Sequence, residues 1–286
     1  MDQDLFVLYD DYANGGTSRR EFFDRLAKVA GGAAAALGLL PLLEHNYAFA
    51  QTIADTDPRL TTSKVEYDAS GSKVAGYLAQ PKDGKKHPAV IVIHENRGLN
   101  PHIQDVARRF AAEGFLALAP DALSPVGGTP ADETKAIELI GKLDAAETVA
   151  RLSAAIPFLA RHAGSTGKVG VVGFCWGGGM VNRIAVASGS SLGAGVSYYG
   201  PQPPAADVPK IQAPLMLHYG ATDQRINAGI EAYEAALKAN SKTYEKFIYE
   251  GAGHAFNNDT RDTSYNKEAA TLAWSRTVAF FKKNLG

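Results

Sequence analysis

Short, continuous apolar runs alternate with longer amphipathic stretches from about residue 60 to the end of the chain. Runs of this kind predict strands buried on both faces of a sheet, and the amphipathic stretches predict helices that cover those faces. The predicted strands span residues 88–94, 115–119, 169–174, 194–199, 214–219 and 244–249. The predicted helices span residues 102–113, 131–162, 180–187, 228–239 and 268–283, the second with breaks near Gly141 and Pro157.

Residues 65–78 alternate between apolar and polar positions around a turn at 69–72, which predicts an antiparallel hairpin at the edge of the sheet. Strands that alternate with helices favour parallel pairing. The pattern therefore predicts an α/β fold with a mostly parallel central sheet flanked by helices on both faces.

The start of the chain does not follow this alternation. Arg19 and Arg20 precede an uncharged run rich in Ala, Gly and Leu at residues 29–43, and residues 48–50 read Ala-Phe-Ala, a small-x-small cleavage motif. Paired arginines before a mildly apolar run resemble a twin-arginine export signal, which carries folded proteins across a bacterial inner membrane. The run contains Pro41 and is shorter than the roughly 20 residues of a membrane span, so we expect cleavage rather than a membrane anchor.

Composition adds limits to this interpretation. The chain has 286 residues, 45% hydrophobic content and a formal net charge of −1, so it carries no electrostatic footprint for nucleic acid. We expect residues 1–50 to be the export signal and residues 51–286 to be one domain, periplasmic or secreted, without a cofactor or a metal. A single cysteine excludes an intramolecular disulfide, and the sequence does not indicate the oligomeric state.

Cys175, the only cysteine, lies where an apolar run meets a glycine-rich corner formed by Gly173, Gly177 and Gly178. Glycines at such a corner let a strand and a helix approach closely, and they let the central residue adopt a strained conformation that presents its side chain to a cleft. This arrangement is typical of the nucleophile elbow of α/β-hydrolases, with cysteine in place of serine. The alternatives are a buried structural cysteine and a dinucleotide-binding turn, although the G-x-G-x-x-G pattern is absent. A helix N-terminus next to the cysteine favours its thiolate form.

Three reactive side chains follow predicted strands in the order Cys175, Asp223, His254. In open α/β sheets, functional sites form outside the carboxyl ends of the strands. The order nucleophile, acid, histidine is that of the α/β-hydrolases. We expect His254 to accept the thiol proton and later to protonate the leaving group, while Asp223 holds the imidazole in the required tautomer.

The remaining histidines and two further aspartates compete for these roles but lie in less suitable places. We expect His45 in the export segment, His87 in a turn, His102 and His162 on solvated helices, His218 as a satisfied core residue, and His94 in a supporting position. Asp207 and Asp259 do not follow a predicted strand directly.

Residues 189–193 match the serine-nucleophile pattern G-x-S-x-G letter for letter. The match follows a predicted helix and precedes a predicted strand, which reverses the strand-to-helix context that the elbow needs. We therefore expect a surface turn there.

Four local sequences together resemble the dienelactone hydrolase (carboxymethylenebutenolidase) family, and the resemblance covers about residues 60–286. They are Gly-Phe-Cys-Trp-Gly-Gly at 173–178, His-Glu-Asn-Arg-Gly at 94–98, the strand end at Asp223, and Gly-His-Ala-Phe at 253–256. The resemblance implies a hydrolase that cleaves a small-molecule ester or lactone.

The resemblance also implies roles for three further residues. The family's glutamate, matched by Glu95, interacts with the cysteine and tunes its protonation, and the backbone N–H groups of Asn96 and Trp176 would form the oxyanion hole. A carboxylate beside a cysteine opposes thiolate formation until substrate displaces it, which would restrain oxidation of the thiol. The alternative for Glu95 is a solvated residue that pairs with Arg97.

The sequence departs from the family at the substrate. The best-known members hold a substrate carboxylate with one arginine in the loop that corresponds to residues 122–125 and another just beyond the catalytic histidine. Here these places read Ala-Leu-Ser-Pro and, at 256–258, Phe-Asn-Asn. Arg97 and Arg261 are the alternatives for this role. The resemblance therefore supports the type of reaction more strongly than the identity of the substrate.

The leading hypothesis is a cofactor-independent hydrolase of an ester or lactone that works through an acyl-cysteine. A thioesterase or acyltransferase on the same triad is the alternative enzyme. A non-catalytic periplasmic protein that retains the fold is the alternative from another class.

Overall fold

The protein is described by a computed structural model, in which residues 8, 12, 17–33, 35, 36, 52–69 and 71–286 are placed well enough to discuss. Its centre is an eight-stranded sheet with the strand order β1-β2-β4-β3-β5-β6-β7-β8. The strands are β1 (Leu60–Ala69), β2 (Ser72–Pro81), β3 (His87–Ile93), β4 (Leu116–Pro120), β5 (Ser165–Phe174), β6 (Ala194–Tyr198), β7 (Leu215–Gly220) and β8 (Tyr244–Tyr249).

Antiparallel pairing is confined to one edge of the sheet. β1 pairs antiparallel with β2, and β2 pairs antiparallel with β4. The pairs from β4 through β3, β5, β6 and β7 to β8 are all parallel. The predicted edge hairpin and the mostly parallel α/β sheet are therefore confirmed.

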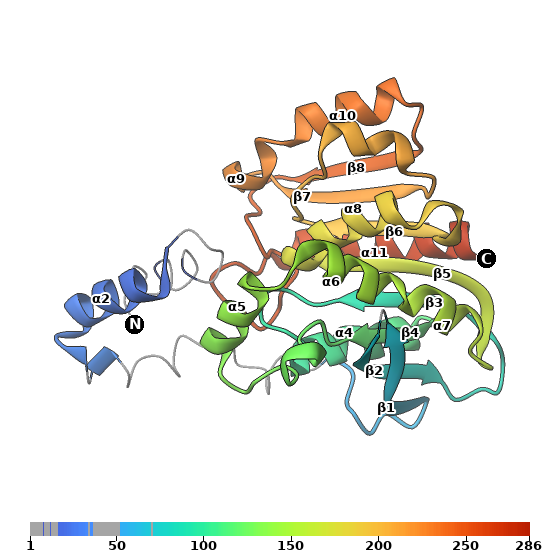
Figure 1. Cartoon of the computed structure of the whole chain (residues 1–286), viewed down its shortest axis with the longest axis horizontal. Coiled ribbons are helices and arrows are strands. Elements are labelled where there is room, and N and C mark those ends of the chain that lie inside the picture. The colour runs from blue at the N-terminus through green and yellow to red at the C-terminus, as the bar shows by residue number, and fades with distance from the viewer. Residues whose placement is uncertain (1–7, 9–11, 13–16, 34, 37–51, 70) are drawn as a thin grey trace.

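Helices cover both faces of the sheet (Figure 1). Helices α4 (Pro101–Ala112) and α11 (Lys267–Leu285) pack on one face, where Phe110 and Phe281 join the same apolar cluster. The other face is covered by α6 (Ala145–Ser153), α7 (Ala155–Ala160), α8 (Trp176–Ala187) and α10 (Ile230–Ala239), and α5 (Glu133–Gly141) lies at its margin.

The two faces bury alternate residues of the same strands. In β3, Val90 and Val92 belong to the cluster under α4 and α11, whereas Ile91 and Ile93 belong to the cluster on the opposite face. Both sets of side chains are fully buried. This two-sided burial explains why the strand is a continuous apolar run rather than an alternating one.

The helices differ from the prediction in three places. The helical stretch at 131–162 breaks after Gly141, as predicted, but its second break falls at Ala154 and not at Pro157. Pro157 sits in the first turn of α7, where a backbone N–H has no partner within the helix and its loss costs little. Helix α8 begins at Trp176, directly after Cys175, and a short extra helix, α9 (Gln224–Asn227), precedes α10.

Part of the amino-terminal segment forms a helix, α2 (Arg19–Ala30), that lies to one side of the sheet (Figure 1). The Ser18 hydroxyl caps it by accepting a hydrogen bond from the Glu21 amide at 3.3 Å, and Phe22 is buried. Arg19 forms an ion pair with Glu138 of α5 at 3.2 Å. The proposed cleavage motif at 48–50 and the histidine at 45 lie outside the described residues.

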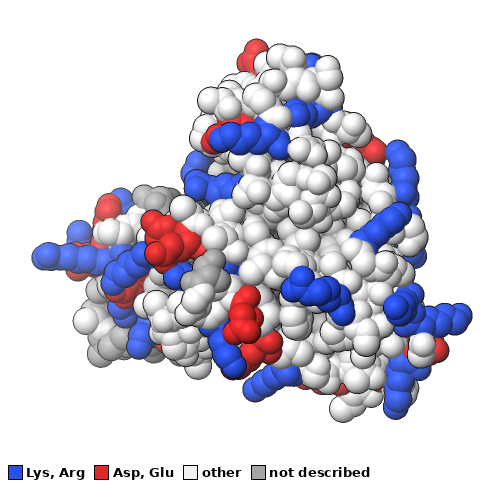
Figure 2. Space-filling model, turned by 45° about the vertical axis from the view of Figure 1, so that its right-hand side comes forward, with Lys and Arg blue, Asp and Glu red and all other residues white. Residues whose placement is uncertain are grey.

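No helix in the described part of the chain is both long and apolar enough to cross a membrane. On the face shown in Figure 2, Lys and Arg side chains are scattered among Asp and Glu rather than gathered into one patch.

Candidate active site

Cys175 occupies a sharp corner between β5 and α8. Its backbone has φ 55° and ψ −117°, a conformation that is strained for a residue with a side chain, and it is 6% exposed. The neighbouring glycines make this corner possible, since a Cβ on Gly177 would lie 2.4 Å from the His94 carbonyl oxygen and one on Gly178 would lie 2.6 Å from the Tyr198 carbonyl oxygen. The predicted close approach of strand and helix is confirmed.

The corner provides a stability test. We expect Gly177→Ala to lower the free energy of unfolding by roughly 1–3 kcal/mol or more, because the added methyl group meets backbone atoms that cannot move aside. Gly141→Ala is the matched control, because nothing lies within 4 Å of its added Cβ. Urea unfolding of both variants measures the difference in stability. Equal unfolding midpoints for the two variants would contradict the prediction.

The side chains of Cys175, His254 and Asp223 form one continuous chain of contacts. His254 Nε2 lies 3.1 Å from Cys175 Sγ, and His254 Nδ1–H donates to Asp223 Oδ2 at 2.5 Å. Asp223 follows β7 and caps α9, where its Oδ1 accepts a hydrogen bond from the Ile226 amide at 3.3 Å. The ends of three different strands, far apart in the sequence, thus bring together the three predicted residues.

The electrostatics of this chain favour a charged imidazole. Burial alone lowers the pKa of His254, but the adjacent Cys175 sulfur and the Asp223 carboxylate outweigh it and raise that pKa to about 10. An imidazole whose pKa is raised in this way holds a proton that it can give to a leaving group.

A pocket of about 240 Å³ opens over Cys175 and His254. Asn96, which follows β3, and Trp176, the first residue of α8, also line it, so both predicted oxyanion-hole residues border the thiol. The Trp176 ring stacks on His94, with ring centroids 5.3 Å apart. The remaining lining residues are Ile137, Ile140, Gly141, Pro201 and Arg225.

Glu95 does not line this pocket, and its carboxylate is engaged by other side chains. It is 2% exposed, so the interpretation as a solvated residue is wrong. Its Oε2 accepts a hydrogen bond from Asn258 Nδ2 at 2.8 Å and lies 4.0 Å from Arg97 Nη1. Among the described residues no hydrogen bond joins Glu95 to Cys175, and the tuning role implied by the resemblance stays a prediction.

The two arginines considered for substrate binding are both buried away from the pocket. Arg97 Nε lies 3.4 Å from a carboxylate oxygen of Glu133 at the start of α5. Neither Arg97 nor Arg261 is among the residues that line the pocket over Cys175.

Tyr199 is a site residue that the sequence reasoning missed. It directly follows β6, has a φ of 38°, and its ring packs 5.1 Å from the His254 ring. Burial raises the pKa of its hydroxyl well above the usual value, and the nearby Glu95 and Cys175 act in the same direction. The predicted strand at 194–199 included Tyr199, whereas β6 ends at Tyr198, so the rule that selects polar residues after strands did not reach it.

Two further histidines, His218 and His94, make structural hydrogen bonds. His218 accepts or donates hydrogen bonds at both ring nitrogens, to Tyr249 and Thr277, and burial lowers its pKa to about 3, so the predicted core role is confirmed. His94 donates to the Glu95 carbonyl at 2.6 Å and accepts from the Ala122 amide at 3.2 Å, and burial lowers its pKa.

Three surface expectations were wrong or need adjustment. His102 is 3% exposed and not solvated, because Asp259 lies against its Nδ1 at 3.2 Å. His162 is half-buried beyond the end of α7, and His87 begins β3 rather than lying in a turn. The G-x-S-x-G match forms a short 3₁₀ turn at Gly189–Ser191 with exposed serines, as predicted.

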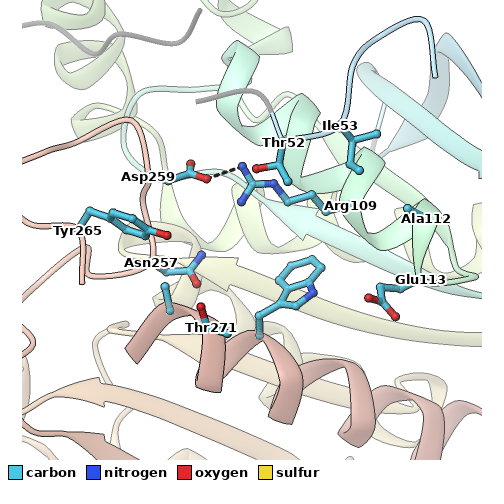
Figure 3. A pocket seen from close by; sticks show the side chains of 11 residues that line it. Thr52, Ile53, Arg109, Ala112, Glu113, Asn257, Asp259, Tyr265 and Thr271 are labelled. Carbon is cyan, nitrogen blue, oxygen red and sulfur yellow. Dashed lines mark hydrogen bonds and ion pairs between the residues drawn. The ribbon is translucent and has the colours of Figure 1, made fainter. Parts of the chain in front are cut away.

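A second pocket, of about 320 Å³, is lined by Asn257, Asp259 and Arg109, among others (Figure 3). Asp259 bonds Arg109 there at 2.6 Å, so this competing acid is engaged away from His254. Asp207 is likewise engaged, with Lys210 at the surface. The lining of this second pocket contains no cysteine, serine or histidine.

The sheet order, the strained corner after β5 and the acid and histidine after β7 and β8 define an α/β-hydrolase. Within that class, the model of the dienelactone hydrolase family matches residues 74–285, and the chain belongs to this family. It is a hydrolase that acts on ester or lactone bonds. A separate family model, described as YqhI-like, matches residues 1–32.

Individual relatives agree with this assignment. A Methylorubrum extorquens protein, provisionally named carboxymethylenebutenolidase, is 33% identical over 82% of this chain and 85% of its own length. A crystal structure from Klebsiella pneumoniae, provisionally named dienelactone hydrolase, is 32% identical with a TM-score of 0.71, over 78% of this chain and 99% of that one. A dienelactone hydrolase-like promiscuous phosphotriesterase from metagenomic libraries is 26% identical, also with a TM-score of 0.71, over 80% of this chain and 100% of that one.

Proposed function

We propose that this protein hydrolyses an ester or lactone through a Cys175-His254-Asp223 triad and an acyl-cysteine intermediate. The observation that carries the proposal is the unbroken contact chain from Sγ through the imidazole to the carboxylate, at 3.1 and 2.5 Å. The presence of Cys175 and His254 together in the lining of one pocket supports it as well.

In the first half of the reaction the Cys175 thiolate attacks the carbonyl carbon, and the carbonyl π electrons move to oxygen. The backbone N–H groups of Asn96 and Trp176 donate to that oxyanion. When the carbonyl reforms, the bond to the alcohol oxygen breaks and the His254 imidazolium gives its proton to the departing oxygen. The products are a thioester on Cys175 and an alcohol, which stays attached to the acyl group when the substrate is a lactone.

In the second half a water molecule loses a proton to neutral His254 and attacks the thioester carbonyl. The oxyanion passes through the same two donors, and the C–S bond breaks to release the carboxylic acid and the thiolate. Asp223 keeps the Nδ1 proton in place throughout, so that Nε2 faces the reacting atoms.

Acyl-enzyme trapping tests this proposal. The protein is mixed with a panel of 4-nitrophenyl esters and lactones, quenched in acid, and analysed by peptide mass spectrometry. We expect an acyl adduct on Cys175 that decays as the acid appears. Competing alcohols and thiols distinguish a transferase, which would give new esters or thioesters in place of the acid. An adduct on any other residue would contradict the proposed nucleophile.

We also propose that residues 1–50 direct export and are removed. The paired arginines, the apolar run and the Ala-Phe-Ala motif support this, and the separate family match over residues 1–32 is consistent with a segment distinct from residues 51–286. Export would place the enzyme in the periplasm or outside the cell.

The proposed export leads to a prediction about the paired arginines. We expect Arg19→Lys combined with Arg20→Lys to leave the precursor in the cytoplasm, because twin-arginine recognition depends on both guanidinium groups. Lysine keeps the positive charge near Glu138, so the contact with α5 is least disturbed. Arg25→Lys, on the same helix but outside the pair, is the control. Cell fractionation locates each variant, and periplasmic protein that still begins at Met1 would reject cleavage.

A further inference from the structure

The second pocket is separate from the proposed site of hydrolysis. Among the described residues, it shares no lining residue with the pocket over Cys175. Figure 3 shows Asn257 and Thr271 along one side of it and Thr52 and Ile53 along the other. Its volume of about 320 Å³ is at the lower end of the range for small-molecule sites, which suits a compound with a single ring.

Asn257 brings an unpartnered amide to this pocket. Its side chain is 5% exposed, and across the described residues its amide group makes no hydrogen bond. The neighbouring Asn258 is satisfied by contrast, because its side chain bonds both Glu95 and Thr260. A nearly buried amide without partners costs free energy, and it offers two N–H donors and one carbonyl acceptor. A ligand that both donates and accepts hydrogen bonds would satisfy it.

The charged groups of the lining are already paired. Arg109 bonds Asp259 at 2.6 Å and Asp105 at 2.8 Å. Glu113 forms an ion pair with Lys282 at 3.1 Å. A charged ligand would give up its hydration here without meeting an unpaired charge in the described part of the lining, so the pocket favours a neutral ligand.

Trp274 of α11 provides an aromatic surface. It is half-buried, and its ring packs on Phe110 with ring centroids 4.5 Å apart. Ile53, Ala112 and Ala270 add apolar surface to the same lining. An aromatic ring in the ligand can pack against the indole in a stacked or edge-to-face arrangement.

We propose that the second pocket binds a neutral aromatic molecule with a single ring that carries a carboxamide or a hydroxyl group. The ring packs against Trp274, and the polar group exchanges hydrogen bonds with the amide of Asn257. This binding does not depend on the proposed triad, because the two pockets have separate linings.

The two tryptophans of the chain allow the two pockets to be observed separately, since Trp176 lines one and Trp274 lines the other. In full-length Trp176→Phe protein, we expect benzamide to change the fluorescence of Trp274 in a saturable way. In Trp274→Phe protein, the fluorescence of Trp176 should not respond. A response from Trp176 alone would place benzamide over Cys175 and would overturn the proposal, as would the absence of any saturable response.

A matched set of probes tests the class of ligand. Benzoate and benzylamine have a ring of the same size as benzamide but carry opposite charges, and both should bind roughly tenfold or more weakly. Cyclohexanecarboxamide, which lacks the aromatic ring, should also bind more weakly. The tighter of benzamide and benzyl alcohol identifies the preferred polar group. Equal affinities for benzamide, benzoate and benzylamine would overturn the proposal.

Substitution of Asn257 tests the polar contact. In the Trp176→Phe background, Asn257→Leu should weaken benzamide binding roughly tenfold, because it removes the hydrogen bonds and keeps a similar volume. Asn240→Leu is the control, since Asn240 is exposed at the end of α10 and should keep the original affinity.

Asn257→Asp keeps almost the original shape, so it also tests the contact if Asn257→Leu fails to fold, which circular dichroism would reveal. Its added negative charge should shift the preference from benzamide towards the cation benzylamine. Unchanged affinities for both probes in Asn257→Asp, or unchanged benzamide affinity in folded Asn257→Leu, would overturn the proposal.

Discussion

Cys175→Ala is expected to abolish hydrolysis of every ester or lactone that the wild-type protein cleaves. The substitution removes the sulfur that His254 Nε2 faces at 3.1 Å, and no other cysteine exists in the chain to replace it. Alanine keeps the Cβ that the strained corner already accommodates, so the fold should survive. Steady-state kinetics measure the loss of activity. Circular dichroism and a thermal melt check that the fold survives.

Cys175→Ser separates nucleophile identity from geometry. Serine offers a hydroxyl to the same imidazole, but a hydroxyl is far less acidic than a thiol and is therefore harder to activate as a nucleophile. We expect a loss of roughly 10²-fold or more in kcat/KM rather than a silent exchange. Ser191→Ala is the matched control for the decoy motif and should be silent, because Ser191 is exposed in a surface turn. Full activity in Cys175→Ala would remove the basis of the mechanism.

The principal site residues were predictable because each is marked by a local pattern at a strand end. An apolar run followed by glycines marks Cys175, and similar strand ends precede Asp223 and His254. Parallel strands all present their carboxyl ends at one edge, so local strand predictions already imply that these side chains meet. The structure adds the contact distances and the φ of 55° at Cys175. The glycine spacing predicted a strained corner but neither of these values.

Burial by distant segments was not predictable in this way. The helical pattern around His102 gives the helix correctly, but the residue that covers it, Asp259, comes from a segment after β8. The same segment supplies Asn258 to Glu95. A single sequence shows the period of a helix and not what packs on its polar face, so both contacts required the tertiary structure.

Arg225, which lines the pocket over Cys175, illustrates the same limit. Sequence reasoning looked for arginines where the family carries them and considered Arg97 and Arg261, both of which are buried outside the pocket. The short helix α9 was not expected, because four residues are too few to show a periodic pattern. Only the placement of α9 against the pocket revealed a cation near the reacting groups.

Asp223→Asn is expected to lower kcat/KM by roughly 10²- to 10⁴-fold with little effect on folding. Asparagine still caps α9, since its Oδ1 can accept the Ile226 amide hydrogen bond as the aspartate does at 3.3 Å. That bond directs the new amide NH₂ group toward His254 Nδ1, which must then accept a hydrogen bond instead of donating one. The ring proton moves to Nε2, so the nitrogen facing Cys175 can no longer take the thiol proton.

The pH dependence of activity in Asp223→Asn tests the same argument, because the direction in which the profile shifts can be predicted. The Asp223 carboxylate is one of the groups that raise the pKa of His254 to about 10, so its removal lowers that pKa. Because the mechanism needs protonated His254 for leaving-group departure, activity is lost as pH rises through this pKa. The alkaline limb of the kcat/KM profile should therefore move to lower pH in the variant. Asp207→Asn, which alters a surface pair with Lys210, should keep the wild-type profile. An unshifted limb in Asp223→Asn, with wild-type kcat/KM, would show that another group orients the imidazole.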